Sequence, residues 1–132
     1  MLIYLDSSAI VKLVLSEHES RALFDALIAL PERVTSVIGA IEVARAVRRV
    51  STSKRSSERL GNVLDSLALV ELDAPVRSRA ATLEPIGLRT LDAIHLSTAL
   101  GLGDDLAGFV TYDERQALAA SEAGLQVVSP GR

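Results

Sequence analysis

Short hydrophobic segments of strand type alternate with longer segments of helical periodicity along the whole chain. The strand-like segments are rich in apolar and β-branched residues and lie at 2–5, 33–36, 68–72, 108–111 and 126–128. The segments in which apolar residues recur at helical spacing lie at about 8–16, 19–30, 37–50, 55–66, 75–84, 91–102 and 114–122. Short strands that alternate with helices are typical of parallel sheets. The pattern therefore predicts an α/β fold, with a central, mostly parallel β-sheet of about five strands flanked by helices on both faces.

Composition limits the classes of protein to which the chain can belong. Its 132 residues are within the usual size of one domain, so we expect residues 1–132 to form a single domain. The chain has no cysteine, which excludes a disulfide framework and favours a cytoplasmic setting. Asp6 and Lys12 interrupt the apolar N-terminal stretch, so we expect neither a signal peptide nor a membrane-spanning helix there.

Two acidic residues lie where predicted strands end. Asp6 directly follows the first strand, in the stretch LIYLD, and Asp113 comes just after a later strand, in the stretch GFVTYD. Ligands of open α/β sheets bind beyond the carboxyl ends of the strands. If these two strands are neighbours, both carboxylates face one crevice. Either residue could instead serve only as the N-cap of the helix that follows it.

Two further acidic residues lie on predicted helices. Asp92 belongs to a helix that is apolar on nearly all sides, which is typical of a buried helix. A buried carboxylate needs a partner, although an N-cap at Thr90 would place Asp92 in a first turn, where the helix dipole favours negative charge. Glu42 borders the apolar face of its helix, and its alternative role is a surface ion pair with Arg45.

A divalent cation would account for all these acidic residues at once. Each of Asp6, Glu42, Asp92 and Asp113 has an ordinary structural explanation when it is taken alone. Carboxylates gathered in one cleft repel one another, however, unless protons or a cation neutralise them. Oxygen ligands without cysteine favour Mg²⁺ or Mn²⁺ over Zn²⁺. The four residues together therefore predict a metal site.

Four segments resemble the signature segments of the PIN domain, in the same order and over nearly the whole chain. They are IYLDSSAIVKL, SVIGAIEVARA, LRTLDAIHLSTAL and FVTYDERQALAASEAGLQVVSPG. More narrowly, they are similar to the VapC-type ribonuclease toxins of prokaryotic toxin–antitoxin pairs. The resemblance implies an acidic quartet that binds the metal and performs catalysis, formed by Asp6, Glu42, Asp92 and Asp113. It also implies that the quartet is supported by hydroxyl groups at Ser7 or Ser8 and at Thr111.

The resemblance also implies an activity and partners. It predicts a Mg²⁺-dependent endoribonuclease, with Mn²⁺ as a possible substitute, that hydrolyses RNA phosphodiester bonds. It further predicts a cognate antitoxin protein that blocks the cleft, a homodimer, and no association with a membrane. The alternative is a catalytically silent PIN-like module that binds RNA or protein without cutting.

Two classes of phosphoryl-transfer enzyme fit the sequence poorly. A haloacid-dehalogenase site needs a second aspartate two residues after the first, where this chain has Ser8. A receiver domain needs a lysine after a late strand, but the only lysines are Lys12 and Lys54.

The net charge is −3, yet basic residues gather in segment 45–59. They are Arg45, Arg48, Arg49, Lys54, Arg55 and Arg59. This segment is either a rim that follows RNA phosphates, a solvated helical hairpin, or a surface for a protein partner.

His95 lies three residues after Asp92 and could touch a metal, but its apolar neighbours favour a hydrogen-bonded histidine of the core.

Overall fold

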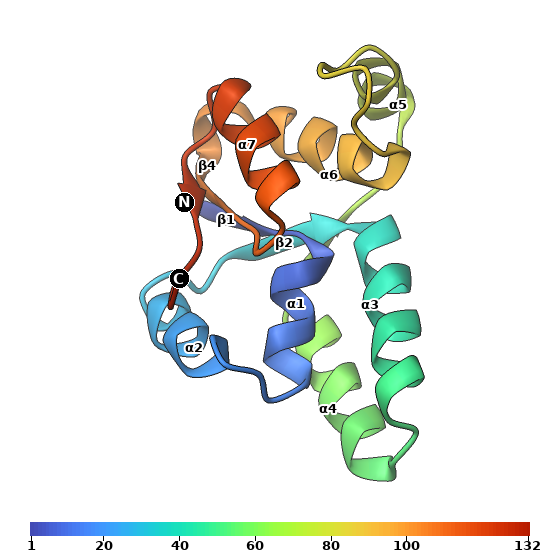
Figure 1. Ribbon diagram of the computed structural model, residues 1–132, viewed down its shortest axis with the longest axis vertical. Helices are drawn as coiled ribbons and strands as arrows, with labels where there is room; N and C mark the ends of the chain where they lie inside the picture. Colours follow the sequence, from blue (N-terminus) through green and yellow to red (C-terminus); the bar gives the residue numbers. More distant parts are fainter.

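The centre of the protein is a sheet of five parallel strands, seen in a computed structural model that describes residues 1–132 (Figure 1). The strands are β1 (Leu2–Leu5), β2 (Arg33–Ser36), β3 (Ala68–Val70), β4 (Leu106–Val110) and β5 (Val127–Val128). Their order across the sheet is β3-β2-β1-β4-β5, and every neighbouring pair is parallel. All five strand predictions are confirmed, and the sheet is parallel throughout.

Seven α-helices connect the strands, and each corresponds to a helical segment predicted from the periodicity. They are α1 (Ser7–Val14), α2 (Ser20–Ile28), α3 (Val37–Val50), α4 (Lys54–Asp65), α5 (Ala74–Ala81), α6 (Thr90–Leu100) and α7 (Glu114–Glu122). A 3₁₀ turn at Gly103–Asp105 precedes β4. None of these helices combines the length and the apolar character that a membrane crossing requires.

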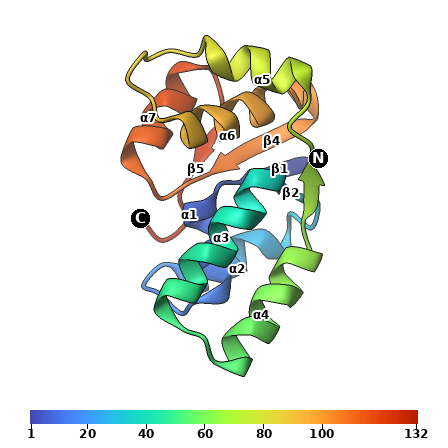
Figure 2. The same ribbon diagram turned by 90° about the vertical axis from the view of Figure 1, so that its right-hand side faces the viewer.

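The helices cover the sheet on both faces, as predicted (Figures 1 and 2). Alternate residues of β1 point to opposite sides: Ile3 and Leu5 pack with α1, α2 and α3, whereas Tyr4 packs with α6 and α7. Strands that are buried on both faces are apolar over their whole length, as LIYL is in β1. This double burial fixes β1 in the middle of the molecule, with its carboxyl end at a defined edge.

The edge at the carboxyl ends of β1 and β4 is the place where the strand order reverses. From β1 the chain first adds β2 and β3 on one side, and later β4 and β5 on the other. Leu5 pairs with Val110, so the residues that follow β1 and β4 emerge side by side. Such a switch point leaves a crevice between the diverging helices, and ligands of α/β folds bind there.

Candidate active site

The structure places all four predicted acidic residues around the switch point between β1 and β4. Asp6 follows β1, and Asp113 lies three residues beyond the end of β4. Asp92 lies in the first turn of α6, where it interacts electrostatically with Asp113 and with Glu42 of α3. β1 and β4 are neighbouring strands, which is the condition under which Asp6 and Asp113 were expected to face one crevice.

Asp6 is a buried carboxylate held by hydroxyl groups, with no basic side chain bonded to it. Its side chain is almost wholly enclosed, at 4% exposure for the residue. Ser8 Oγ donates to Oδ1 at 2.6 Å, the Ala9 backbone N–H donates to the same oxygen, and Thr111 Oγ1 donates to Oδ2. Burial raises the pKa of Asp6, and the hydrogen bonds from Ser8 and Thr111 only partly counteract this effect. A cation beside Asp6 would favour its charged form.

The capping explanation for the two strand-end acids is also correct. Asp6 is the N-cap of α1, and Asp113 is the N-cap of α7, where its Oδ1 accepts from the backbone of Arg115 and Gln116. Capping occupies one oxygen of Asp113 and does not remove it from the crevice. Gln116 also donates from Nε2 to the backbone oxygen of Asp92 at 3.0 Å, so it ties the two acidic turns together.

Asp92 and Asp113 share a shallow hollow of about 320 Å³, which Arg89, Glu114 and Arg115 also line. Burial raises the pKa of Asp92, and the negative charges of Asp113 and Glu42 raise it further. The predicted N-cap at Thr90 is wrong, because Thr90 is the first helical residue and Arg89 takes the cap position without a side-chain hydrogen bond. Asp92 is nevertheless in the first turn of α6, as the capping argument required.

Glu42 is bonded to the core of the protein and not to Arg45. Its Oε1 accepts from Ser7 Oγ at 2.6 Å and lies 2.6 Å from His95 Nε2. Burial by itself raises the pKa of Glu42, but the hydrogen bonds from His95 and Ser7 outweigh burial and lower it. The alternative surface pair between Glu42 and Arg45 is absent from the ion pairs of the structure.

The hydroxyl residues divide between two carboxylates. Ser8 and Thr111 bond to Asp6, whereas Ser7 bonds to Glu42. Thr111 also accepts from the backbone N–H of Asp113 at 3.1 Å, which links both strand ends. The structure therefore brings all three predicted hydroxyl residues into contact with predicted acids.

The donor set matches a hard divalent cation, but the protein does not form a closed cage of ligands. No three His, Cys, Asp or Glu side chains lie close enough together to hold a metal ion. Mg²⁺ is usually bound through one or two carboxylates and keeps several of its water molecules. Raised pKa values at Asp6 and Asp92 fit such a cation, because its charge would offset the burial and repulsion of these groups.

Three further residues lie at the site, although they were not among the site residues predicted from the sequence. His95 is buried, as predicted, but both of its ring nitrogens have polar partners, and one of these partners is Glu42. Arg89 and Arg115 flank the hollow of Asp92 and Asp113. Their positions follow from the turn before α6 and the first turn of α7, and no spacing in the sequence relates the two arginines.

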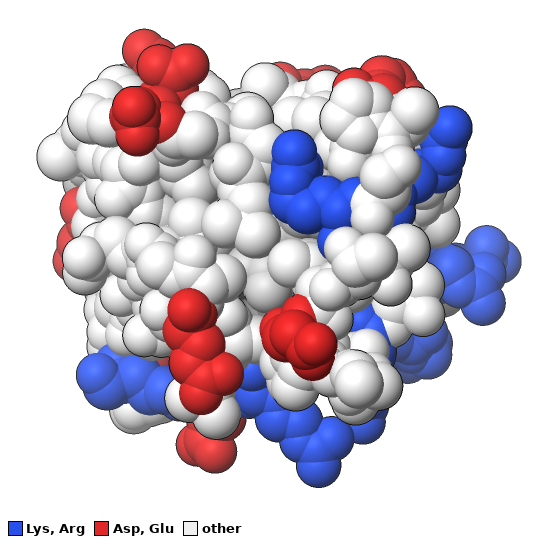
Figure 3. Space-filling view, turned by 90° about the horizontal axis from the view of Figure 1, so that it is seen from above, with Lys and Arg blue, Asp and Glu red and all other residues white.

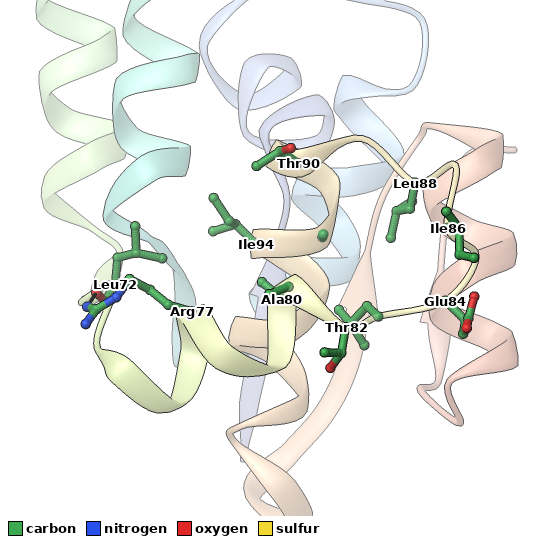
Figure 4. Close-up of a pocket in the computed structure, with 12 residues that line it drawn as sticks. Leu72, Arg77, Ala80, Thr82, Glu84, Ile86, Leu88, Thr90 and Ile94 are labelled. Atoms are coloured by element: carbon green, nitrogen blue, oxygen red, sulfur yellow. Dashed lines mark hydrogen bonds between the residues drawn. The ribbon is translucent and has the colours of Figure 1, made fainter.

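A larger hollow lies elsewhere, between α5, the segment that follows it, and α6 (Figure 4). It measures about 660 Å³ and is mostly apolar, with Ile86 exposed at its edge and Ile94 contributed by α6. Glu84 is its only acidic residue, so it offers no cluster of carboxylates. The acidic crevice, and not this larger hollow, has the groups needed for metal chemistry.

The basic segment 45–59 divides into two parts. Arg45, Arg48 and Arg49 of α3 line a hollow of about 480 Å³ and take part in no ion pair. Arg59 of α4 instead donates to the Leu13 backbone oxygen at 3.0 Å. At the end of the molecule formed by α5, α6 and α7, basic side chains lie along the right-hand side and the lower edge of the view, and acidic groups are scattered among neutral ones (Figure 3).

Comparison with known proteins identifies related chains. Residues 3–122 match the family model described as PIN domain. The chain is 46% identical over 128 residues to Ribonuclease VapC46 of Mycobacterium tuberculosis, with 97% of each chain covered. Its fold is similar to VapBC2 from Rickettsia felis, a structure bound to a DNA fragment from its promoter, with a TM-score of 0.78, 16% identity, and coverage of 98% and 99%. It is also similar to a toxin–antitoxin complex from Klebsiella pneumoniae, with a TM-score of 0.72, 22% identity, and 97% of each chain covered.

Proposed function

Because the chain belongs to the PIN domain family and, within it, to the VapC ribonucleases, we propose that it is a metal-dependent endoribonuclease toxin. The observation that carries the catalytic part of this proposal is the buried carboxylate of Asp6, which has hydroxyl partners but no basic one. It lies at the switch point of the sheet, and Thr111, which donates to it, also accepts from the backbone N–H of Asp113, a residue of the acidic hollow. Residues 1–132 act as one domain, in the cytoplasm.

Asp6 and Asp92 are the main ligands for Mg²⁺ in this proposal, and Mn²⁺ can replace it. Asp113 and Glu42 complete the site directly or through water molecules. When bound, the cation lowers the pKa of a water molecule and stabilises the charge that develops at the scissile phosphate. Ser8 and Thr111 hold the Asp6 carboxylate in place by donating to both of its oxygens.

RNA must approach an acidic site, and the arginines nearby supply opposite charge. Arg89 and Arg115 lie beside the carboxylates of Asp92 and Asp113, where they can contact phosphate groups. Arg45 follows Glu42 by three residues on α3, so the unpaired arginines of this helix continue outward from the site. This arrangement favours the RNA-binding interpretation for the α3 part of the basic segment.

The partners in this proposal are an RNA substrate, a cognate antitoxin protein and a second copy of the chain. The similarity to a toxin–antitoxin complex supports the antitoxin. Several large apolar side chains are exposed, and these are the kind of groups that protein partners cover. The most exposed of them are Met1, Ile28, Ile41, Val50, Ile86 and Leu118.

Expression of the isolated chain in bacteria tests the proposed toxicity. We expect growth to stop with the wild type and to continue with Asp6→Asn, because the amide carries no charge with which to hold a cation. Asp65→Asn, at an exposed position at the end of α4, is the matched control and should remain toxic. An Asp6→Asn variant that is folded and as inhibitory as the wild type would contradict the nuclease explanation of toxicity. Such a result would favour a module that binds without cutting.

A further inference from the structure

A continuous chain of hydrogen bonds runs from the core of the protein to Glu42. Tyr4 of β1 and His95 of α6 are buried, at 0% and 2% exposure. The Tyr4 hydroxyl lies 2.6 Å from His95 Nδ1, and His95 Nε2 lies 2.6 Å from Glu42 Oε1. Ser7 Oγ adds a second hydrogen bond to the same Glu42 oxygen. Three elements that are distant in sequence thus meet at one carboxylate.

The partners at both ends of this chain fix the position of each proton. The backbone N–H of Ser36 can only donate, so the Tyr4 oxygen accepts its hydrogen bond. In a neutral imidazole that carries its proton on Nε2, Nδ1 is an acceptor, so the Tyr4 hydroxyl donates to it. Glu42 is a carboxylate and only accepts, so His95 carries its proton on Nε2 and donates it to Oε1.

This arrangement leaves one oxygen of Glu42 free. The hydrogen bonds from His95 and Ser7 both end on Oε1, and no hydrogen bond reaches Oε2. A glutamate side chain has several rotatable bonds and loses considerable freedom when it is fixed in one position. Hydrogen bonds on a single oxygen fix the carboxylate while its other oxygen stays available to a cation or a water molecule.

The packing around His95 makes room for this contact. Gly39 lies on α3, one turn before Glu42. A Cβ atom at Gly39 would lie 2.9 Å from His95 Cε1 and 2.6 Å from Thr35 Oγ1, which is closer than ordinary contact permits. The absence of a side chain at Gly39 therefore lets α3 approach α6 closely enough for Glu42 to reach the imidazole.

We propose that Tyr4 and His95 are positioning residues that hold Glu42 for cation binding, with the Nε2–H of His95 as the group that fixes the carboxylate. This inference rests on the proposed nuclease function and extends it. Partners of this kind, which orient a ligand without touching the metal, commonly change metal affinity or activity by about 10–100-fold when they are removed. A histidine that only filled the core would be replaceable by any residue of similar size that restores stability.

Two substitutions that differ in the position of one N–H group test the proposal. In His95→Gln the amide nitrogen can take the place of Nε2 and still donate to Glu42, whereas in His95→Asn it can only take the place of Nδ1. We expect His95→Gln to keep Mn²⁺ affinity and RNA cleavage close to the wild type. We expect His95→Asn to lose about 10–100-fold in both. Affinity is measured by titration calorimetry with Mn²⁺ alone, and cleavage on the same preparations.

Two further variants separate positioning from stability. Val43→Ala makes a cavity in the core beside Glu42 on α3, so it should lower the melting temperature and leave Mn²⁺ affinity unchanged. Tyr4→Phe keeps the ring and removes only the hydroxyl, so it tests the chain of hydrogen bonds to Glu42 if His95→Asn does not fold. In Tyr4→Phe we expect a fall in Mn²⁺ affinity. We also expect a change in the ¹⁵N signals of the His95 ring, because Nδ1 has lost its donor.

The outcomes distinguish this inference from the proposed function. A wild type that binds Mn²⁺ and cuts RNA, together with a folded His95→Asn variant of equal affinity and rate, would overturn the positioning role alone. Similar losses of Mn²⁺ affinity and RNA cleavage in His95→Gln and His95→Asn, matching the fall in the melting temperature of each variant, would also overturn it. A wild type that neither binds Mn²⁺ nor cuts RNA would overturn the proposed function and this inference together.

Discussion

Replacement of Asp6 by asparagine should make the metal-free protein more stable. Asp6 is buried, has no basic partner and has a raised pKa because of its burial. A buried ion costs several kcal/mol, whereas the asparagine amide weakens the three hydrogen bonds to the side chain by about 1 kcal/mol each. Asparagine keeps Oδ1 as the acceptor for Ser8 and Ala9, and its amide group can donate to Thr111. We therefore expect a net gain of about 1–2 kcal/mol, or roughly 5 °C in melting temperature.

The pH dependence of this gain has a definite sign. The folded protein holds a proton on Asp6 up to a higher pH than the unfolded chain, whose carboxyl has the ordinary value of 3.8. Ionisation of the buried group therefore destabilises the wild type as the pH rises from this value, and the effect is complete above the folded-state pKa. The advantage of Asp6→Asn should be full above the folded-state pKa of Asp6 and should shrink as the pH falls towards 3.8.

Thermal unfolding followed by circular dichroism, at several pH values in EDTA, measures this difference. The same experiment with saturating Mg²⁺ should reverse the order of stability, because only the wild type gains binding energy, about 2.7 kcal/mol at a metal concentration of 100 times Kd. The reasoning is refuted if Asp6→Asn is less stable than the wild type at neutral pH in EDTA. Asp65→Asn provides the control for an acid that is exposed in the folded state.

Other substitutions test separate parts of the site. Gly39→Ala should destabilise the protein by about 1–3 kcal/mol, because its Cβ would overlap Thr35 and His95; an unchanged melting temperature would contradict this packing. Replacing both Arg45 and Arg48 by glutamine should weaken RNA binding by the catalytically inactive Asp6→Asn protein, and should reduce the slope of log K against log salt concentration by about 1.4. An unchanged slope in filter-binding measurements would assign these arginines to a protein partner or to solvent.

The arrangement of helices and strands could be predicted from the sequence because each element has a strong local signal. The strand LIYL is apolar because both of its faces are covered, and the helix 37–50 has one clear apolar side. Local signals define helix ends less well. Asp6 caps α1 as the sequence allowed, but the first turn of α6 has no side-chain cap, although Thr90 was predicted to provide one. Both serines bond to carboxylates of the site, and this use of their hydroxyls depends on contacts that no local pattern contains.

The candidate acids could be found because charged residues at strand ends and in an apolar helix stand out against their surroundings. Their partners could not be found in this way. His95 and Glu42 are 53 positions apart, and their contact depends on the close approach of α3 to α6. The residues on either side of His95 in the sequence are apolar. The prediction of a core histidine was therefore right about its burial but missed its hydrogen bond to Glu42.

Cleavage of RNA by the purified protein is the most direct test of the central claim. Total RNA should be incubated with the antitoxin-free wild type in Mg²⁺, in Mn²⁺ and in EDTA, beside Asp92→Asn and the control Asp65→Asn. We predict discrete cuts with either metal, none in EDTA, full activity in Asp65→Asn, and no activity in a folded Asp92→Asn. Cleavage that persists in EDTA or in Asp92→Asn would contradict an acidic metal centre at the ends of β1 and β4. A folded, metal-bound wild type that cuts no RNA would contradict the nuclease function itself.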